Sequence, residues 1–167
     1  MITVQDYYEP TQPTLLFSLH PEPAQAIEAG TKRIEYRRRF YHQEPFQAFV
    51  HVTGTHGGIG LFLQISQPLV AAPNRLLANL TATDATAIRN YLGNVSQAVA
   101  LPIRTVIAIP RLTLANLRQV DPQFTAPRAY RFLDKSAQHP LRQFLLQQPG
   151  IKKPWSQTIM VFGRLQI

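Results

Sequence analysis

The sequence contains no cysteine, which excludes disulfide bonds, thiolate metal sites and cysteine nucleophiles. Acidic residues are also scarce, because 9 Asp and Glu residues stand against 17 Lys and Arg residues. No uncharged apolar run approaches the roughly 20 residues that a membrane helix requires, so we expect no membrane association. The first residues lack the basic, apolar and small-residue order of a signal peptide. We therefore expect a cytoplasmic protein.

The shortage of acids leaves a formal net charge of +8 on 167 residues. An excess of this sign favours polyanions such as nucleic acids, through long-range attraction and counterion release. Hydrophobic residues make up 45% of the chain, which is typical of a globular domain. With no repeat and no long flexible linker, we expect a single domain over residues 1–167, with residues 1–13 forming an irregular arm.

Hydrophobic periodicity predicts short helices among several strands. Residues 15–19 alternate as in a strand that is buried mainly on one face. Further strands are predicted at 46–54, 58–66, 101–110 and 156–167. Helices are predicted at 21–30, 73–80, 85–93 with Asp84 as the N-cap, 112–120 and 140–150. The pattern indicates an α+β fold, a curled mixed sheet or small barrel with short helices inserted between strands.

The segment from Gly30 to Phe40, GTKRIEYRRRF, concentrates five cations around one acid, Glu35. In a regular strand, Ile34 and Tyr36 fall on one face while Glu35 and Arg37 fall on the other. One face of this strand should therefore pack and the other should carry charge. The alternative is that the charged residues form a solvated face without a ligand.

The region around this segment resembles the signature of ASCH domains, a branch of the PUA-like fold. The signature is a strand, a short helix that ends in glycine, and the motif Gly-x-Lys-x-x-Glu-x-Arg. The four specified positions are filled in register by Gly30, Lys32, Glu35 and Arg37. Ser18 and Pro21 also stand where the family tends to place serine and proline. The detailed resemblance covers residues 15–66.

The resemblance implies a PUA-like β-barrel with a cleft beside the motif, and family members are thought to bind RNA. Some small members hydrolyse acetylated cytidine nucleosides, using a threonine hydroxyl beside the lysine and a separate carboxylate downstream of the motif. Here Glu35 occupies the threonine position, and an ionised carboxylate is a poor nucleophile for an amide. A second acid is hard to find in the predicted sheet, because none occurs within 45–83 or 85–120.

Three functions remain open on these grounds. The leading hypothesis is binding of RNA or a nucleotide through the basic cleft. The alternative is a small hydrolase acting on a modified cytidine nucleoside or on RNA, in which Lys32 and Glu35 would be the catalytic residues; whether the protein is an enzyme stays undecided. The third is a protein-interaction domain with solvated cations.

Within the cleft, Glu35 should orient the Arg37 guanidinium toward a ligand; the alternative is that the two residues form a purely structural ion pair. Lys32 can reach Glu35 only if it lies in the turn after the helix, where the resemblance to ASCH domains places it. The predicted ligand-binding residues are Ser18, Gly30, Lys32, Arg33, Glu35, Arg37, His51 and Thr53. No cofactor is expected. His51 and His56 lack acids or a third ligand nearby, so no metal site is expected either.

A second set of residues mixes cations with aromatic rings, as proteins that bind single-stranded RNA do. The predicted nucleic-acid surface consists of Arg38, Arg39, Arg128, Tyr130, Lys152, Lys153 and Trp155. The alternative is that Tyr130 and Trp155 are buried anchors surrounded by a basic rim.

Overall fold

The computed structural model describes residues 1–157, which contain one mixed sheet of eight strands and five short helices. The strands are β1 (Thr14–Leu19), β2 (Ile34–Arg37), β3 (Phe46–Val52), β4 (Gly58–Ile65), β5 (Leu69–Ala71), β6 (Ala98–Leu112), β7 (Tyr130–Phe132) and β8 (Trp155–Ser156). The α-helices are α1 (Pro21–Ala29), α2 (Pro73–Leu76), α3 (Ala82–Leu92), α4 (Leu114–Val120) and α5 (His139–Leu146). Two single-turn 3₁₀ helices are η1 (Val4–Asp6) and η2 (Ser136–Gln138).

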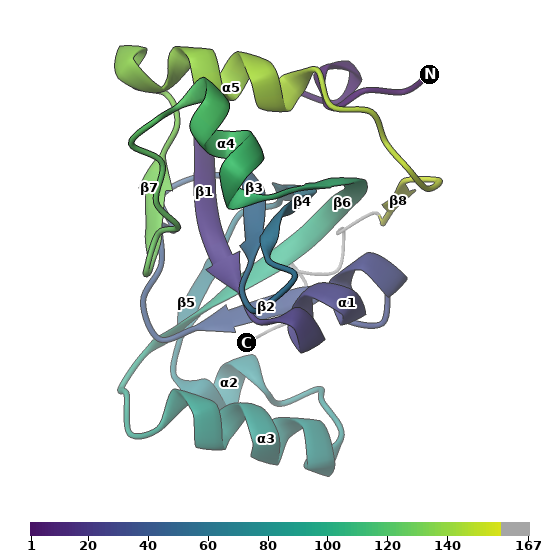
Figure 1. Cartoon of the computed structure of the whole chain (residues 1–167). Coiled ribbons are helices and arrows are strands. Elements are labelled where there is room, and N and C mark those ends of the chain that lie inside the picture. Colours follow the sequence, from purple (N-terminus) through teal and green to yellow (C-terminus); the bar gives the residue numbers. More distant parts are fainter. Residues whose placement is uncertain (158–167) are drawn as a thin grey trace.

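The sheet has the strand order β2-β6-β4-β3-β1-β7, and it curls into a half-barrel (Figure 1). Strand β6 is 15 residues long and connects the two parts of the sheet. Its first residues pair with β2 and β5, whereas the residues from Ile103 onward pair with β4. A register shift opposite Ile103 marks the change of partner. This α+β, PUA-like architecture is the one predicted from the sequence.

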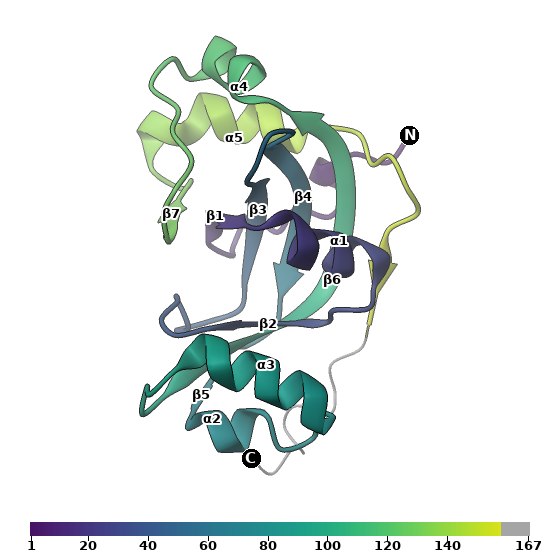
Figure 2. The same cartoon turned by 60° about the horizontal axis from the view of Figure 1, so that its bottom comes forward.

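Helices cover the sheet in separate groups. In Figure 1, α4 and α5 lie at one end of the molecule, and α2 and α3 lie at the other. Figure 2 shows that β2 runs between α1 and α3. Strand β1 is buried on both faces, not mainly on one, because Leu16 belongs to the core cluster that includes α5 while Phe17 belongs to the cluster that includes α1. Strand β1 differs from the predicted strand, which was buried mainly on one face, because α5 covers its second face.

Most predicted elements are present, with three differences. Helix α3 begins at Ala82, and the Thr81 hydroxyl accepts a hydrogen bond from the Asp84 amide, so the predicted N-cap at Asp84 is wrong. Strands β5 and β7 have no counterpart among the predicted elements. The predicted closing strand at 156–167 lies outside the described residues, apart from its first two positions.

The N-terminal arm, residues 1–13, contains η1 and is packed against the rest of the molecule. Val4 is fully buried, and its amide donates to the carbonyl of Gln148. Thr3 also forms a β-bridge with Pro149. The arm therefore helps to cover the end of the sheet that carries α5.

Glycine is needed where the hairpin between β3 and β4 meets β6. Gly58 has a φ of 152°, and a Cβ atom there would lie 2.3 Å from the Leu112 carbonyl oxygen of β6. A side chain would therefore force β4 and β6 apart.

No helix within residues 1–157 has the length and apolar character needed to cross a membrane.

Phe62 tests the packing between the sheet and the α4–α5 end. Its ring is fully buried and lies 5.1 Å from the ring of Phe49. We expect Phe62→Ala to lower the free energy of unfolding by about 3–5 kcal/mol, because it leaves a cavity in a closely packed core. Ile151→Ala, at an exposed position, should change it by less than about 0.5 kcal/mol. Denaturant unfolding measures both, and equal effects would contradict this core assignment.

Candidate functional site

The motif residues are positioned by the way α1 ends. Gly30 closes the helix with a φ of 80°, a left-handed conformation that glycine adopts without steric cost. The amides of Thr31 and Lys32 both donate to the carbonyl of Ala26. Lys32 consequently lies in the turn before β2, where the resemblance to ASCH domains placed it, and its side chain reaches Glu35.

Glu35 is the centre of the site, and it is the only buried charged residue among residues 1–157. Its Oε1 lies 3.4 Å from Lys32 Nζ and accepts a hydrogen bond from the Tyr36 amide at 3.2 Å. Its Oε2 accepts from Arg37 Nε at 3.2 Å. Burial of a carboxylate is costly without compensation, and here two cations provide it. The alternative interpretation, in which the charged residues of this segment form a solvated face, is therefore wrong for Glu35.

Arg37 is fixed by three further contacts. Its Nη2 donates to the Ser18 carbonyl oxygen at 2.7 Å. Its guanidinium carbon lies 5.3 Å from the ring centroid of Phe17 and 5.6 Å from that of Phe40, distances at which a cation is attracted to an aromatic ring. Arg37 therefore links β2 to β1 and has little freedom to move toward a ligand.

A cavity of ≈ 700 Å³, which we call the motif cavity, opens beside these residues. Its polar wall carries Ser18, Lys32, Glu35, Arg37, Thr53 and Arg128. The volume falls within the range of small-molecule binding sites. The structure thus brings together Ser18, Lys32, Glu35, Arg37 and Thr53 from the predicted ligand-binding set, and adds Arg128 from the predicted nucleic-acid surface.

Helix α3 supplies an apolar wall that sequence reasoning missed. Ala87, Ile88 and Tyr91 line the motif cavity from this helix. Tyr91 is 49% exposed, and Arg38 holds the end of α3 by donating to the Tyr91 carbonyl oxygen. Compared with ASCH domains, the sequence predicts that this helix is an insertion. The spacing of its apolar residues indicates a buried face but does not indicate what that face covers.

A second acid also lines the motif cavity. Glu22, in the first turn of α1, contributes to the wall together with Pro23. This carboxylate comes from the helix that precedes the motif, whereas the resemblance implies an acid downstream of the motif. Thr53, also in the wall, has its Oγ1 3.2 Å from His20 Nδ1. The Ser18 hydroxyl donates to the Pro127 carbonyl oxygen at 2.8 Å.

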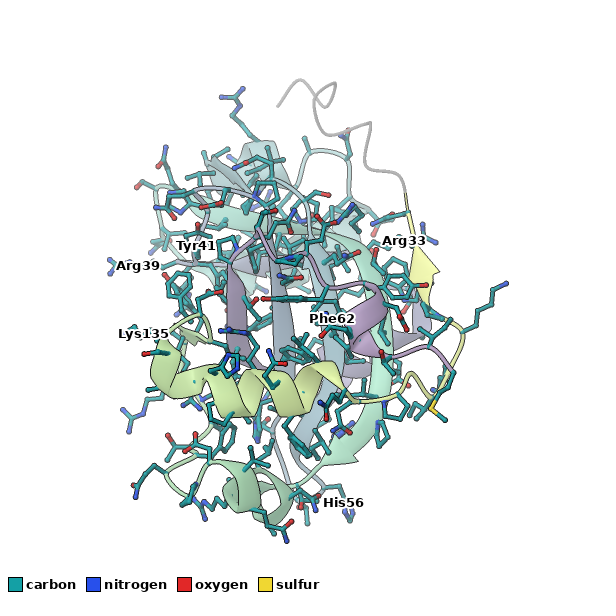
Figure 3. The ribbon with its side chains drawn as sticks, turned by 90° about the horizontal axis from the view of Figure 1, so that it is seen from above. Arg33, Arg39, Tyr41, His56, Phe62 and Lys135 are labelled. Carbon is teal, nitrogen blue, oxygen red and sulfur yellow. The ribbon has the colours of Figure 1, made fainter. Side chains whose placement is uncertain are left out.

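Three predicted ligand-binding residues lie outside the motif cavity. Gly30 faces the indole of Trp155, because a Cβ atom there would lie 3.7 Å from Trp155 Nε1. The Arg33 guanidinium lies 5.7 Å from the Trp155 ring, and Figure 3 shows Arg33 beside β8. His51 lines a different cavity, separated from the first by residues 125–127.

Most residues of the predicted nucleic-acid surface make contacts within the protein. Trp155 Nε1 donates to the Ile27 carbonyl oxygen, and the ring of Tyr130 lies 4.6 Å from that of Phe40. These two aromatic residues are half-buried anchors, which supports the alternative interpretation. Lys152 forms an ion pair with Glu28. Arg39 and Lys153 are exposed and line neither cavity, and Figure 3 shows Arg39 at the edge of the molecule.

Within residues 1–157, no group of three or more His, Asp or Glu side chains is placed to hold a metal ion. Polar contacts in the motif cavity would instead come from an ammonium group, a guanidinium, hydroxyls and carboxylates. Such a set can bind a ligand that carries both negative charge and hydrogen-bond donors.

Comparison with solved structures identifies the fold. The ASCH protein from Zymomonas mobilis superposes with a TM-score of 0.69 and 21% sequence identity, over 83% of this chain and 98% of that chain. Two variants of it, one with tyrosine replaced by phenylalanine and one with serine replaced by alanine, each give a TM-score of 0.67 at 23% identity. The alignments cover 78% and 81% of this chain, and 96% and 99% of those chains.

Comparison of the sequence gave no such match. No family model matches the chain, and no curated protein is similar enough in sequence to match it. The structural neighbours nevertheless confirm the resemblance to ASCH domains at the level of fold. Because their identity to this chain is low, the ligand has to be argued from the site itself.

The fixed position of Arg37 can be tested by a substitution that keeps its charge. Arg37→Lys loses the planar group that joins Glu35 to the Ser18 carbonyl oxygen, so we expect the free energy of unfolding to fall by about 1–3 kcal/mol. Arg39→Lys, at an exposed position, is the matched control and should have almost no effect. Denaturant unfolding of the two variants provides the measurement. Equal stability of both would show that the guanidinium geometry is unimportant.

Proposed function

We propose that the motif cavity binds a nucleotide, either free or as one unit of an RNA strand. The observation that carries this proposal is the buried Glu35 carboxylate, held by Lys32 and Arg37 in the wall of a cavity of ≈ 700 Å³. Buried acids that are oriented by two cations and face a cavity are candidates for ligand recognition, because their remaining lone pairs can accept hydrogen bonds from a ligand.

The two walls suit the two parts of a nucleotide. The apolar wall with Ile88 and the exposed Tyr91 offers a surface for a base to pack against. Glu35 can accept a hydrogen bond from an amino or imino group on the edge of that base. Lys32 and Arg128 can contact a phosphate. Among residues 1–157, Lys32 has only one ionic partner, Glu35, and Arg128 is exposed at the rim of the motif cavity.

The overall charge supports a polyanionic partner. The chain carries a formal net charge of +8, which accelerates the approach of RNA and strengthens its binding at low salt. The ASCH fold itself does not specify the ligand, since one fold can carry different functions. The proposal therefore depends on the chemistry of the cavity.

A second candidate is hydrolysis of a modified nucleoside, favoured by the position of Glu22. This carboxylate lines the same cavity as Lys32 and as the hydroxyls of Ser18 and Thr53, so an acid, a lysine and a hydroxyl do occur together. However, the Ser18 proton is directed to the Pro127 carbonyl oxygen, and Lys32 is paired with Glu35. Neither contact activates a hydroxyl in the way an amide hydrolase requires.

Direct binding measurements test the first proposal. We expect the wild-type protein to bind at least one of the ribonucleoside monophosphates, with an affinity that falls as salt rises. Tyr91→Ala and Lys32→Ala should each weaken that binding by about tenfold or more, through the removal of a stacking surface and of a charge-assisted hydrogen bond. Isothermal titration calorimetry at several salt concentrations measures the affinities.

Lys153→Ala is the matched control, because it removes a lysine that lines neither cavity. Thermal unfolding of each variant separates loss of binding from loss of structure. Unchanged affinity in both Tyr91→Ala and Lys32→Ala, with the fold intact, would place the ligand elsewhere.

A separate assay decides between binding and hydrolysis. We expect negligible release of cytidine from acetylated cytidine by the wild-type protein, because Glu35 stands where a hydroxyl nucleophile would be needed. Chromatography of the reaction products measures turnover for the wild type, Lys32→Ala and Glu35→Thr. Robust wild-type turnover that Lys32→Ala abolishes would contradict the binding-only proposal. Activity that appears only in Glu35→Thr would show a hydrolase pocket in which only the nucleophile is missing.

A further inference from the structure

A second cavity of ≈ 600 Å³, the arginine cavity, lies next to the motif cavity. It is lined by the turn between β3 and β4, the end of β6, the start of α4 and residues 125–126. Figure 3 shows His56, from that turn, at the edge of the molecule beside α4. The nucleotide site described above uses none of the polar or charged side chains of this cavity.

The charge of the arginine cavity is entirely positive. Arg111 and Arg118 contribute guanidinium groups, and none of the residues that line it is acidic. Neither arginine forms an ion pair with any residue of 1–157. The motif cavity differs in this respect, because Lys32 and Arg37 there share Glu35. The arginine cavity therefore has uncompensated positive charge, which favours an anion.

Both guanidinium groups are held in place by backbone carbonyls. Arg111 Nη1 donates to the His56 carbonyl oxygen at 3.1 Å, and Arg118 Nε donates to the Phe124 carbonyl oxygen at 3.2 Å. Arg111 also lies directly over Gly60 of β4, where a Cβ atom would be 2.6 Å from its Nε. Arginine has five N–H donors, so each group keeps donors for an anion after these contacts.

His51 adds an unused polar atom to the same cavity. Its Nδ1 is buried and has no hydrogen-bond partner among residues 1–157. Burial, and to a lesser extent the charge of Arg111, lowers the pKa of His51, which favours the neutral form of the ring. A neutral imidazole can donate to or accept from a ligand without adding charge. Buried polar atoms without a partner are rare in folded proteins, and a ligand is one explanation for this one.

The two cavities share a wall. Thr53 lines the motif cavity and the next residue, Gly54, lines the arginine cavity. Ala126 lines both. A ligand that fills the motif cavity therefore needs only to pass over these few small residues to reach Arg111 and Arg118.

We infer that the arginine cavity binds the phosphate of a nucleotide adjacent to the one held in the motif cavity, so that the preferred ligand is a short single-stranded RNA. This inference rests on the proposed nucleotide site, which it extends from one nucleotide to a strand. The small wall residues allow the backbone to pass between the two cavities, and the anchored guanidinium groups suit a phosphate because they are planar and rigid.

The test compares RNA trinucleotides with the four ribonucleoside monophosphates. Wild-type protein should bind trinucleotides about tenfold or more tighter than mononucleotides. The double variant Arg111→Gln, Arg118→Gln should bind trinucleotides only as tightly as mononucleotides, while mononucleotide binding stays unchanged. The slope of log affinity against log salt should fall by about 0.7 for each phosphate that the variant no longer neutralises. Isothermal titration calorimetry measures all of these quantities.

Two further variants sharpen the comparison. Arg39→Gln, Lys153→Gln removes the same charge from exposed positions that line neither cavity, and it should keep the preference for trinucleotides. Gly60→Ala keeps both arginines but displaces the Arg111 guanidinium, so it should reduce the preference. Thermal unfolding checks that each variant is folded.

The outcomes separate this inference from the proposed function. A double variant that keeps the full wild-type preference overturns the inference and leaves the nucleotide site standing. Trinucleotide binding that the double variant abolishes, without any mononucleotide binding by the wild type, supports the arginine cavity and contradicts the nucleotide site. Equal binding of trinucleotides and mononucleotides, together with inorganic phosphate binding that the double variant loses, would show a site for free phosphate and overturn the inference. Absence of all binding by the wild type overturns both.

Discussion

The candidate site depends on one buried charge, the carboxylate of Glu35. Burying a carboxylate is unfavourable unless cations and hydrogen-bond donors replace the water it loses, and Lys32, Arg37 and the Tyr36 amide do so here. Removing one partner of such a cluster typically costs about 3–5 kcal/mol, since it leaves the other charge buried and uncompensated. Arg37 extends the cluster by donating to the Ser18 carbonyl oxygen of β1. The charge therefore couples the turn after α1 to two strands that pair with different neighbours in the sheet.

The local part of this arrangement could be predicted from the sequence, because it depends on short spacings. Gly30 ends α1, Lys32 follows in the turn, and Glu35 and Arg37 are two residues apart on one strand. The N-terminus of α3 shows the limit of local reasoning. Thr81 and Asp84 are both good N-cap residues, three positions apart, and the sequence does not say which of them begins the helix.

The enclosing parts of the site could not be predicted, because long-range packing brings them together. The apolar wall comes from α3, and Arg128 comes from the segment before β7. His51 and Thr53 are equivalent in the sequence, since residues two apart on a strand share a face. Ala126, however, belongs to the wall between the two cavities, so that Thr53 faces one and His51 the other. Strand β3 also ends at Val52, so Thr53 lies beyond the strand and is not bound to the face of His51.

The arginines of this chain show why net charge alone is a weak guide to the ligand site. With few acids available, many of them donate to backbone carbonyl oxygens instead: Arg38 to Tyr91, Arg131 to Thr125 and Arg142 to Leu133. Such a hydrogen bond fixes the guanidinium but does not neutralise it, so the same residue both holds a loop and adds to the positive field. Part of the net positive charge therefore belongs to arginines that hold loops in place and need not contact a ligand. The cations relevant to the proposed ligand sites are those that also line a cavity, and Arg111 and Arg118 combine such a position with a fixed guanidinium.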